Sequence, residues 1–176
     1  MEATKWIIDQ SHSEIRFKIK HLMISTVTGS FNSFNGFIYS YDDQLNKGKS
    51  IKFQADVRSL FTNNAERDVH LRSADFFDVD LYPKIIFTAS AFELKKGELA
   101  GKLTIKGTTR SIKLKVKKGG IGKDARGQMR GGISAQGKIS RTAFGLTWND
   151  LTHAGNIIVG DEVLMLAELQ LIKVGG

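Results

Sequence analysis

The sequence contains no cysteine and only one proline among its 176 residues. The missing thiols exclude disulfide bonds, thiolate metal sites and cysteine nucleophiles. A single proline beside 18 glycines suits strands joined by tight turns better than it suits a helical bundle. Apolar runs are also short. None approaches the ~20 residues that a membrane-spanning helix needs, so no stable insertion into a membrane is expected.

The amino-terminal segment lacks the marks of a secretory signal. No basic cluster heads the chain, and the charged residues Glu14 and Arg16 follow before any apolar run of signal length. The chain as it stands is therefore expected in the cytoplasm. Removal of a leader from a longer precursor would leave the same sequence, and the expected location would then be the periplasm.

The net charge of the chain is +8, from 26 basic and 18 acidic residues. Such a balance is compatible with nucleic acid, an anionic membrane surface or an anionic ligand as partner. The lysines, however, mostly alternate with apolar residues, as Lys113, Lys115 and Lys117 do with Ile112, Leu114 and Val116. This pattern is typical of the solvated outer face of a sheet. A nucleic-acid binder needs basic residues gathered on one face beside exposed aromatics, so no nucleic-acid partner is expected.

Alternation of apolar and charged residues is the dominant pattern in the chain. Ile15, Phe17 and Ile19 are apolar, their neighbours are charged, and His21 continues the apolar phase. Similar alternation recurs in eight or nine segments, which predicts an all-β antiparallel sandwich or barrel. No repeat or second domain is visible, so residues 1–176 are expected to form one domain.

The alternation is interrupted between Leu60 and Pro83. Asn63 or Asn64 is expected to cap one short helical segment near residues 64–78, and Ser73 to cap a second turn that contains Phe76 and Phe77. A glycine-rich basic stretch, residues 119–126, is expected to be a mobile loop.

Two polar groups each have two possible roles. His21 would either bond a backbone carbonyl or side chain at the end of the sheet, or provide a polar contact inside an apolar lumen. Arg67 and His70 have the spacing of one helix face. The planar guanidinium of Arg67 suits a phosphate or carboxylate head group. It would alternatively pair with Asp68 or Asp75 and pin this segment across the barrel.

Aromatic residues are plentiful among the strands and beside the interruption. Aromatics in a sheet protein usually belong to the core. A long apolar cavity would be lined by the same residues, so their periodicity does not separate the two interpretations.

Two kinds of site are not expected. The histidines His12, His21, His70 and His153 have separations that match no short metal-ligand motif. Asp150 lies near His153 in the sequence, but no serine occupies a G-x-S-x-G elbow. The sequence therefore assigns neither a metal ligand nor a catalytic residue.

Several stretches together resemble the YceI-like family of lipid-binding proteins. They run in order over nearly the whole chain: DQSHSEIRFKIKHL at Asp9–Leu22, GSFNSFNG at Gly29–Gly36, RDVHLRSADFFDV at Arg67–Val79, YPKIIF at Tyr82–Phe87, GKLTIKGTT at Gly101–Thr109 and SRTAFG at Ser140–Gly145. The family motif H-S-x-x-x-F-x-x-x-H-L falls on His12, Ser13, Phe17, His21 and Leu22, and the motif R-D-x-H-L falls on Arg67, Asp68, His70 and Leu71.

The resemblance implies an extended, eight-stranded antiparallel β-barrel similar to lipocalins. It also implies a lumen that holds a long isoprenoid chain, a quinone or another amphiphile. Dimers occur in the family, several members are periplasmic, and no catalytic activity is established for the family at large.

The expected function is non-enzymatic binding, sequestration or transport of a long-chain amphiphile, such as a polyisoprenoid, a quinone or a fatty-acid derivative. No cofactor is required, and the expected partners are this lipid and a second copy of the chain in a homodimer. The alternative is an enzyme of unknown reaction that uses His21 or His70 at the barrel mouth. The residues expected to contact the ligand are Phe17, Ile19, His21, Phe31, Phe53, Arg67, His70, Phe76, Phe77, Phe87 and Trp148.

Overall fold

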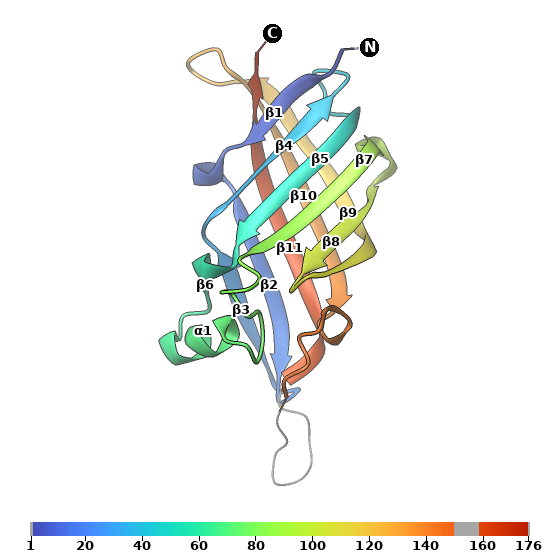
Figure 1. Cartoon of the computed structure of the whole chain (residues 1–176). Helices are drawn as coiled ribbons and strands as arrows, with labels where there is room; N and C mark the ends of the chain where they lie inside the picture. Colours follow the sequence, from blue (N-terminus) through green and yellow to red (C-terminus); the bar gives the residue numbers. More distant parts are fainter. Residues whose placement is uncertain (1, 150–158, 176) are drawn as a thin grey trace.

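The computed structural model describes residues 2–149 and 159–175, and its antiparallel strands form a closed barrel (Figure 1). Neighbouring strands follow the order β1-β4-β5-β7-β8-β9-β10-β11-β2-β3-β6, and β1 also pairs with β11, which closes the ring. The strands are β1 (Thr4–Ile8), β2 (Glu14–His21), β3 (Ser25–Phe31), β4 (Phe34–Ser40), β5 (Lys47–Asp56), β6 (Leu60–Phe61), β7 (Lys84–Glu93), β8 (Glu98–Ile105), β9 (Thr108–Lys123), β10 (Met129–Ser140) and β11 (Val159–Val174).

Two strands of the barrel wall are each broken into two segments. β1 and β2 both pair with β11 and are separated by a 3-10 turn at Gln10–His12. β3 pairs with β2, and β4 pairs with β1 and β5, with a bend at residues 32–33 between them. Counted without the two-residue β6 and with each broken strand taken once, the wall has eight strands. The expected all-β, eight-stranded antiparallel barrel is therefore confirmed.

Asp9 holds the break between β1 and β2. Its carboxylate accepts bonds from the Ser11 hydroxyl at 2.7 Å and from Nη1 of Arg130 at 2.8 Å, and Nδ1 of His12 lies 2.8 Å from it. The Ser13 hydroxyl donates to the Asp9 carbonyl at 2.7 Å. The bonds from Ser11 and Arg130 hold the pKa of Asp9 well below its usual range. His12 and Ser13 of the family motif therefore belong to this polar corner.

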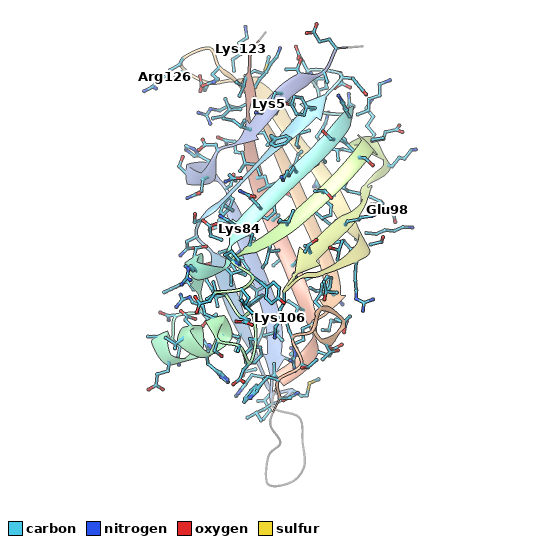
Figure 2. The ribbon with its side chains drawn as sticks, in the orientation of Figure 1. Lys5, Lys84, Glu98, Lys106, Lys123 and Arg126 are labelled. Atoms are coloured by element: carbon cyan, nitrogen blue, oxygen red, sulfur yellow. The ribbon has the colours of Figure 1, made fainter. Side chains whose placement is uncertain are left out.

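The outer face of the barrel is charged and one of its ends is closed. Figure 2 shows Glu98 and Lys123 projecting away from the barrel, as the alternation predicts. At the end where both termini lie (Figure 1), Leu45 from the β4–β5 connection is fully buried with Trp6 and Leu171. Leu45 and Trp6 both lie against Gly131, the cross-strand partner of Leu171, so these three side chains form a plug at that end of the lumen.

The interruption folds as a short helix followed by turns. α1 (Ala65–Arg72) begins after Asn64, whose side chain accepts a bond from the Arg67 amide at 3.0 Å, which confirms Asn64 as the cap. The turn predicted after Ser73 is present, and the Ser73 hydroxyl oxygen caps it by accepting from the Asp75 amide at 3.3 Å. Residues 74–77 form a hydrogen-bonded turn, and Phe76 N donates to Ser73 O at 3.0 Å. The helix ends because Ser73 is extended (φ −71°, ψ 172°).

The glycine-rich stretch 119–126 is not the expected loop. β9 continues to Lys123, where Gly122 pairs with Arg130 and Ile121 with Gly131 of β10, and only residues 124–128 connect the strands. Pairing of Ile121 and Gly122 with β10 keeps the stretch extended, although the register shifts at residues 119–120. Asp150 and His153 lie outside the described residues. The helices in residues 2–149 and 159–175 are too short or too polar to cross a membrane.

Candidate ligand-binding site

The barrel encloses a cavity of about 580 Å³, lined mainly by apolar side chains. Four adjacent strands contribute one layer of its wall, in which Val116, Ala135, Ala167 and Ile15 are successive cross-strand partners. Two of the four are alanines, and their short side chains leave space in the lumen at this level. The volume lies within the roughly 300–1,000 Å³ typical of small-molecule sites.

All eleven residues predicted to contact a ligand line this cavity. They come from β2, β3, β5, β7, the helical segment and the stretch after β10, so the fold brings together residues that are far apart in the sequence. The inward phase predicted for Phe17, Ile19 and His21 is confirmed by their place in the lining. Contact of these residues with a bound molecule stays a prediction.

Aromatic rings form one side of the lumen. Phe17 lies directly across from Gly29, where a Cβ atom would come within 2.2 Å of the Phe17 ring. The ring of Phe31 lies 5.6 Å from that of Phe17 and 6.1 Å from that of Phe77, measured between centroids. Glycine at position 29 therefore lets Phe17 lie against the wall instead of across the lumen.

Arg67 is fixed by β6 and its neighbours, and neither ion pair expected for it is present. Its Nε donates to the Thr62 hydroxyl at 2.8 Å, and its Nη2 donates to the Thr62 carbonyl. Asp68 is buried and accepts from the Thr62 amide at 3.0 Å, while Asp75 bonds His70. The predicted Arg67–Asp68 and Arg67–Asp75 pairs are therefore wrong. With two of its nitrogens held, the guanidinium borders the cavity in a defined orientation.

His70 joins α1 to the aromatic wall. Its Nε2 lies 2.8 Å from Oδ2 of Asp75. Its ring meets Trp148 edge-on at 4.6 Å and Phe76 at 5.1 Å, and the last two rings lie 5.3 Å apart. The Asp75 bond fixes the imidazole orientation, so His70 presents a fixed edge to the cavity.

His21 lies at the end of β2 and lines the same cavity. Within residues 2–149 and 159–175, its ring makes no hydrogen bond that would hold it as a structural histidine. In the same described part of the chain, no group of three or more His, Cys, Asp or Glu side chains is placed to hold a metal ion. His21 is therefore available as a polar contact at the edge of an apolar space.

The cavity reaches the surface at the end opposite the plug. The exposed residues Lys20, Asn64 and Glu66 border it beside the β2–β3 hairpin and α1. Trp6 and Leu45 do not line it, because they pack solidly at the other end. The lumen is thus a blind apolar tube with a polar and charged mouth.

Arg141 is a buried residue of this site that the sequence did not indicate. It is 3% exposed and donates to the carbonyls of Leu146 at 2.6 Å, Gly160 at 2.7 Å, Trp148 at 2.8 Å and Val159 at 3.2 Å. Burial lowers the pKa of its guanidinium, although Asp161 opposes this. Arg141 lies in the SRTAFG stretch that resembles the family, but nothing in the sequence indicates that its side chain bonds four backbone carbonyls.

The chain matches known proteins in both sequence and structure. The YceI-like domain model matches residues 6–171. A UPF0312 protein of Staphylococcus epidermidis is 37% identical over 163 residues, covering 91% of this chain and 92% of the relative. The crystal structure of a Campylobacter jejuni YCEI protein is 28% identical with a TM-score of 0.72, covering 89% of this chain and 90% of that one.

A further solved structure shares the fold at lower identity. The polyisoprenoid binding domain from Saccharophagus degradans, implicated in plant cell wall breakdown, has a TM-score of 0.71 and 14% identity. The match covers 96% of this chain and 98% of that domain.

Proposed function

The chain belongs to the YceI-like domain family, and on that premise we propose that it binds a long-chain amphiphile in the barrel lumen. It carries or sequesters this molecule without chemical change. The blind cavity of about 580 Å³, apolar inside and polar at its mouth, is the observation that carries the proposal. Such a shape suits a molecule with a long apolar tail and a small polar head.

The tail supplies most of the binding free energy. Each buried methylene is worth about 0.8 kcal/mol, so a dozen contribute about 10 kcal/mol before other terms. Association and ordering of the chain offset a large part of this gain. The net affinity therefore depends on tail length more strongly than on any single polar contact.

The head group lies at the mouth, within reach of Arg67 and His21. Arg67 Nη1 forms no bond to the described residues, and its plane is fixed by the two bonds to Thr62. A carbonyl, phosphate or carboxylate oxygen would accept from it. A polyisoprenoid, a quinone and a fatty-acid derivative all fit this description, and the first is the class that the Saccharophagus degradans domain binds.

Native mass spectrometry of gently purified protein tests the proposal. We expect a retained molecule of lipid mass that organic solvent extracts, and binding of a fluorescent long-chain fatty acid after extraction. Protein that carries no lipid and binds no such probe would refute the proposal. The same spectrum reports the oligomer mass and so tests the expected homodimer.

One observation favours a second candidate, an enzyme with His70 as acid or base. The 2.8 Å contact between His70 and Asp75 at the cavity wall has the form of an oriented proton-transfer pair. Turnover of an ester or amide in a substrate screen, lost in His70→Gln, would support it. A screen that finds no turnover would leave the carrier function as the proposal.

A further inference from the structure

We infer that the β2–β3 hairpin tip docks on an anionic lipid bilayer and brings the barrel mouth to its surface. The tip is defined as residues 22–24. This inference rests on the proposed function, because a carrier of a water-insoluble chain must load and unload at a lipid phase.

The tip exposes two adjacent apolar side chains. Met23 is 71% exposed and Ile24 is 84% exposed, the highest value among the large hydrophobic residues that the structure describes. The hairpin between β2 and β3 lies at the end of the barrel away from both termini (Figure 1), and His21, the residue before the tip, lines the cavity. The exposed apolar side chains and the ligand entrance therefore share one end of the molecule.

The backbone of the tip is unfavourable for the residues that form it. Leu22 and Met23 both have positive φ, 54° and 56°, and Ile24 N donates to His21 O at 3.1 Å. Three residues connect the paired His21 and Ser25, and bulky side chains such as Leu22 and Met23 are strained at positive φ. The β8–β9 turn of the same chain places glycine, Gly107, at its second position. Glycine would fit the backbone at position 23 with less strain than methionine, and strained positions are often functional.

The strands behind the tip are basic. Arg16, Lys18 and Lys20 lie on β2, and residues 15–41 contain no Asp or Glu. On the neighbouring strand β11, Asp161 accepts from Thr142, and Glu162 pairs with Lys138. The charge of the hairpin therefore complements anionic phospholipid.

Charge alone does not select this end of the barrel. Lys5, Lys123 and Arg126 stand at the plugged end (Figure 2), so both ends are basic. The combination of exposed apolar side chains, lysines and the cavity mouth is found at the hairpin. Apolar insertion combined with lysine attraction is the usual basis of peripheral membrane binding.

Cosedimentation with vesicles of equal parts phosphatidylglycerol and phosphatidylcholine tests the inference. Met23→Ser with Ile24→Ser is expected to weaken binding at least about tenfold, because both side chains lose apolar contact with the bilayer. Val174→Ser at the plugged end is the matched control and is expected to bind as the parent protein does. Met23→Gly suits the positive φ, and it is expected to stay folded and still bind more weakly.

Two double variants test whether vesicle binding depends on the lysines near the tip or on the net charge of the whole protein. Lys18→Gln with Lys20→Gln is expected to weaken vesicle binding, whereas Lys113→Gln with Lys115→Gln on β9 is expected to leave it unchanged. Equal losses from both pairs, or parent-like binding by the Met23→Ser, Ile24→Ser variant, would overturn the inference. Loss of a dimer in that variant without loss of vesicle binding would overturn it too, because the tip would then be a contact between copies.

Lipid extraction from the same variants keeps the two proposals apart. A protein that retains lipid but does not bind vesicles would refute bilayer docking and leave the carrier function intact. Vesicle binding that depends on the tip, in a protein that retains no lipid and binds no fatty-acid probe, refutes the carrier function instead.

Discussion

Ala135→Phe places a phenyl ring in the middle of the lumen and tests directly whether the cavity is the binding site. Ala135 lies between Val116 and Ala167 in the alanine-containing layer of the wall, and all three line the cavity. At interior packing density, six aromatic carbons occupy about 100 Å³. This is roughly a sixth of the 580 Å³ available.

The added ring displaces about four methylenes of a bound tail. At about 0.8 kcal/mol each, the loss is about 3 kcal/mol, or a decrease in affinity of about 100-fold. The fold is expected to tolerate the ring because the space around it is empty. Stability is expected to change by less than about 1.5 kcal/mol.

Fluorescence titration with a long-chain fatty-acid probe measures this loss. Ala100→Phe is the matched control, because Ala100 is exposed on β8 and the same ring there points away from the lumen. Probe affinity of Ala135→Phe equal to that of Ala100→Phe would show that the tail lies elsewhere. A short-chain probe is expected to lose less affinity than a long one.

Three further predictions concern stability. Arg141→Met leaves four backbone carbonyls without their donor and is expected to lower the unfolding free energy by about 3 kcal/mol in urea titration. Since the folded-state pKa of Asp9 is depressed, its contribution is complete above the usual value near 3.9 and is lost as pH falls below it. Melting curves from pH 7 to 3 are expected to show a smaller acid loss in Asp9→Asn. Met23→Gly relieves a positive φ and is expected to raise the melting temperature by about 2 °C. Ile24→Gly, where φ is negative, is expected to lower it.

Much of the barrel could be predicted because sheet periodicity is a local property. One phase of β2, with Phe17, Ile19 and His21, was enough to predict which side chains face the lumen. Cap chemistry is equally local, and Asn64 begins the helix as expected. The expected loop at 119–126 failed because glycine composition says nothing about a neighbouring strand that can pair with it.

The partners of polar groups could not be predicted, since they depend on tertiary placement. Arg67 has acidic residues one and eight positions away, but it bonds Thr62, which precedes it by five residues, and its sequence position did not indicate which of these would be the partner. Arg141 bonds carbonyls on both sides of residues 150–158. The plug depends on Leu45, whose positive φ of 54° turns it into the barrel. Alternation of apolar and polar residues along a strand does not indicate that a residue in a connection, such as Leu45, is buried.

The solid plug of Trp6, Leu45 and Leu171 has a kinetic consequence. A molecule bound in the lumen can leave only through the mouth by which it entered, so a second molecule cannot displace it from the closed end. For the proposed carrier, exchange of one bound molecule for another therefore passes through an empty protein, and its rate is set by departure of the first molecule. Raising the concentration of a competitor would not hasten this departure.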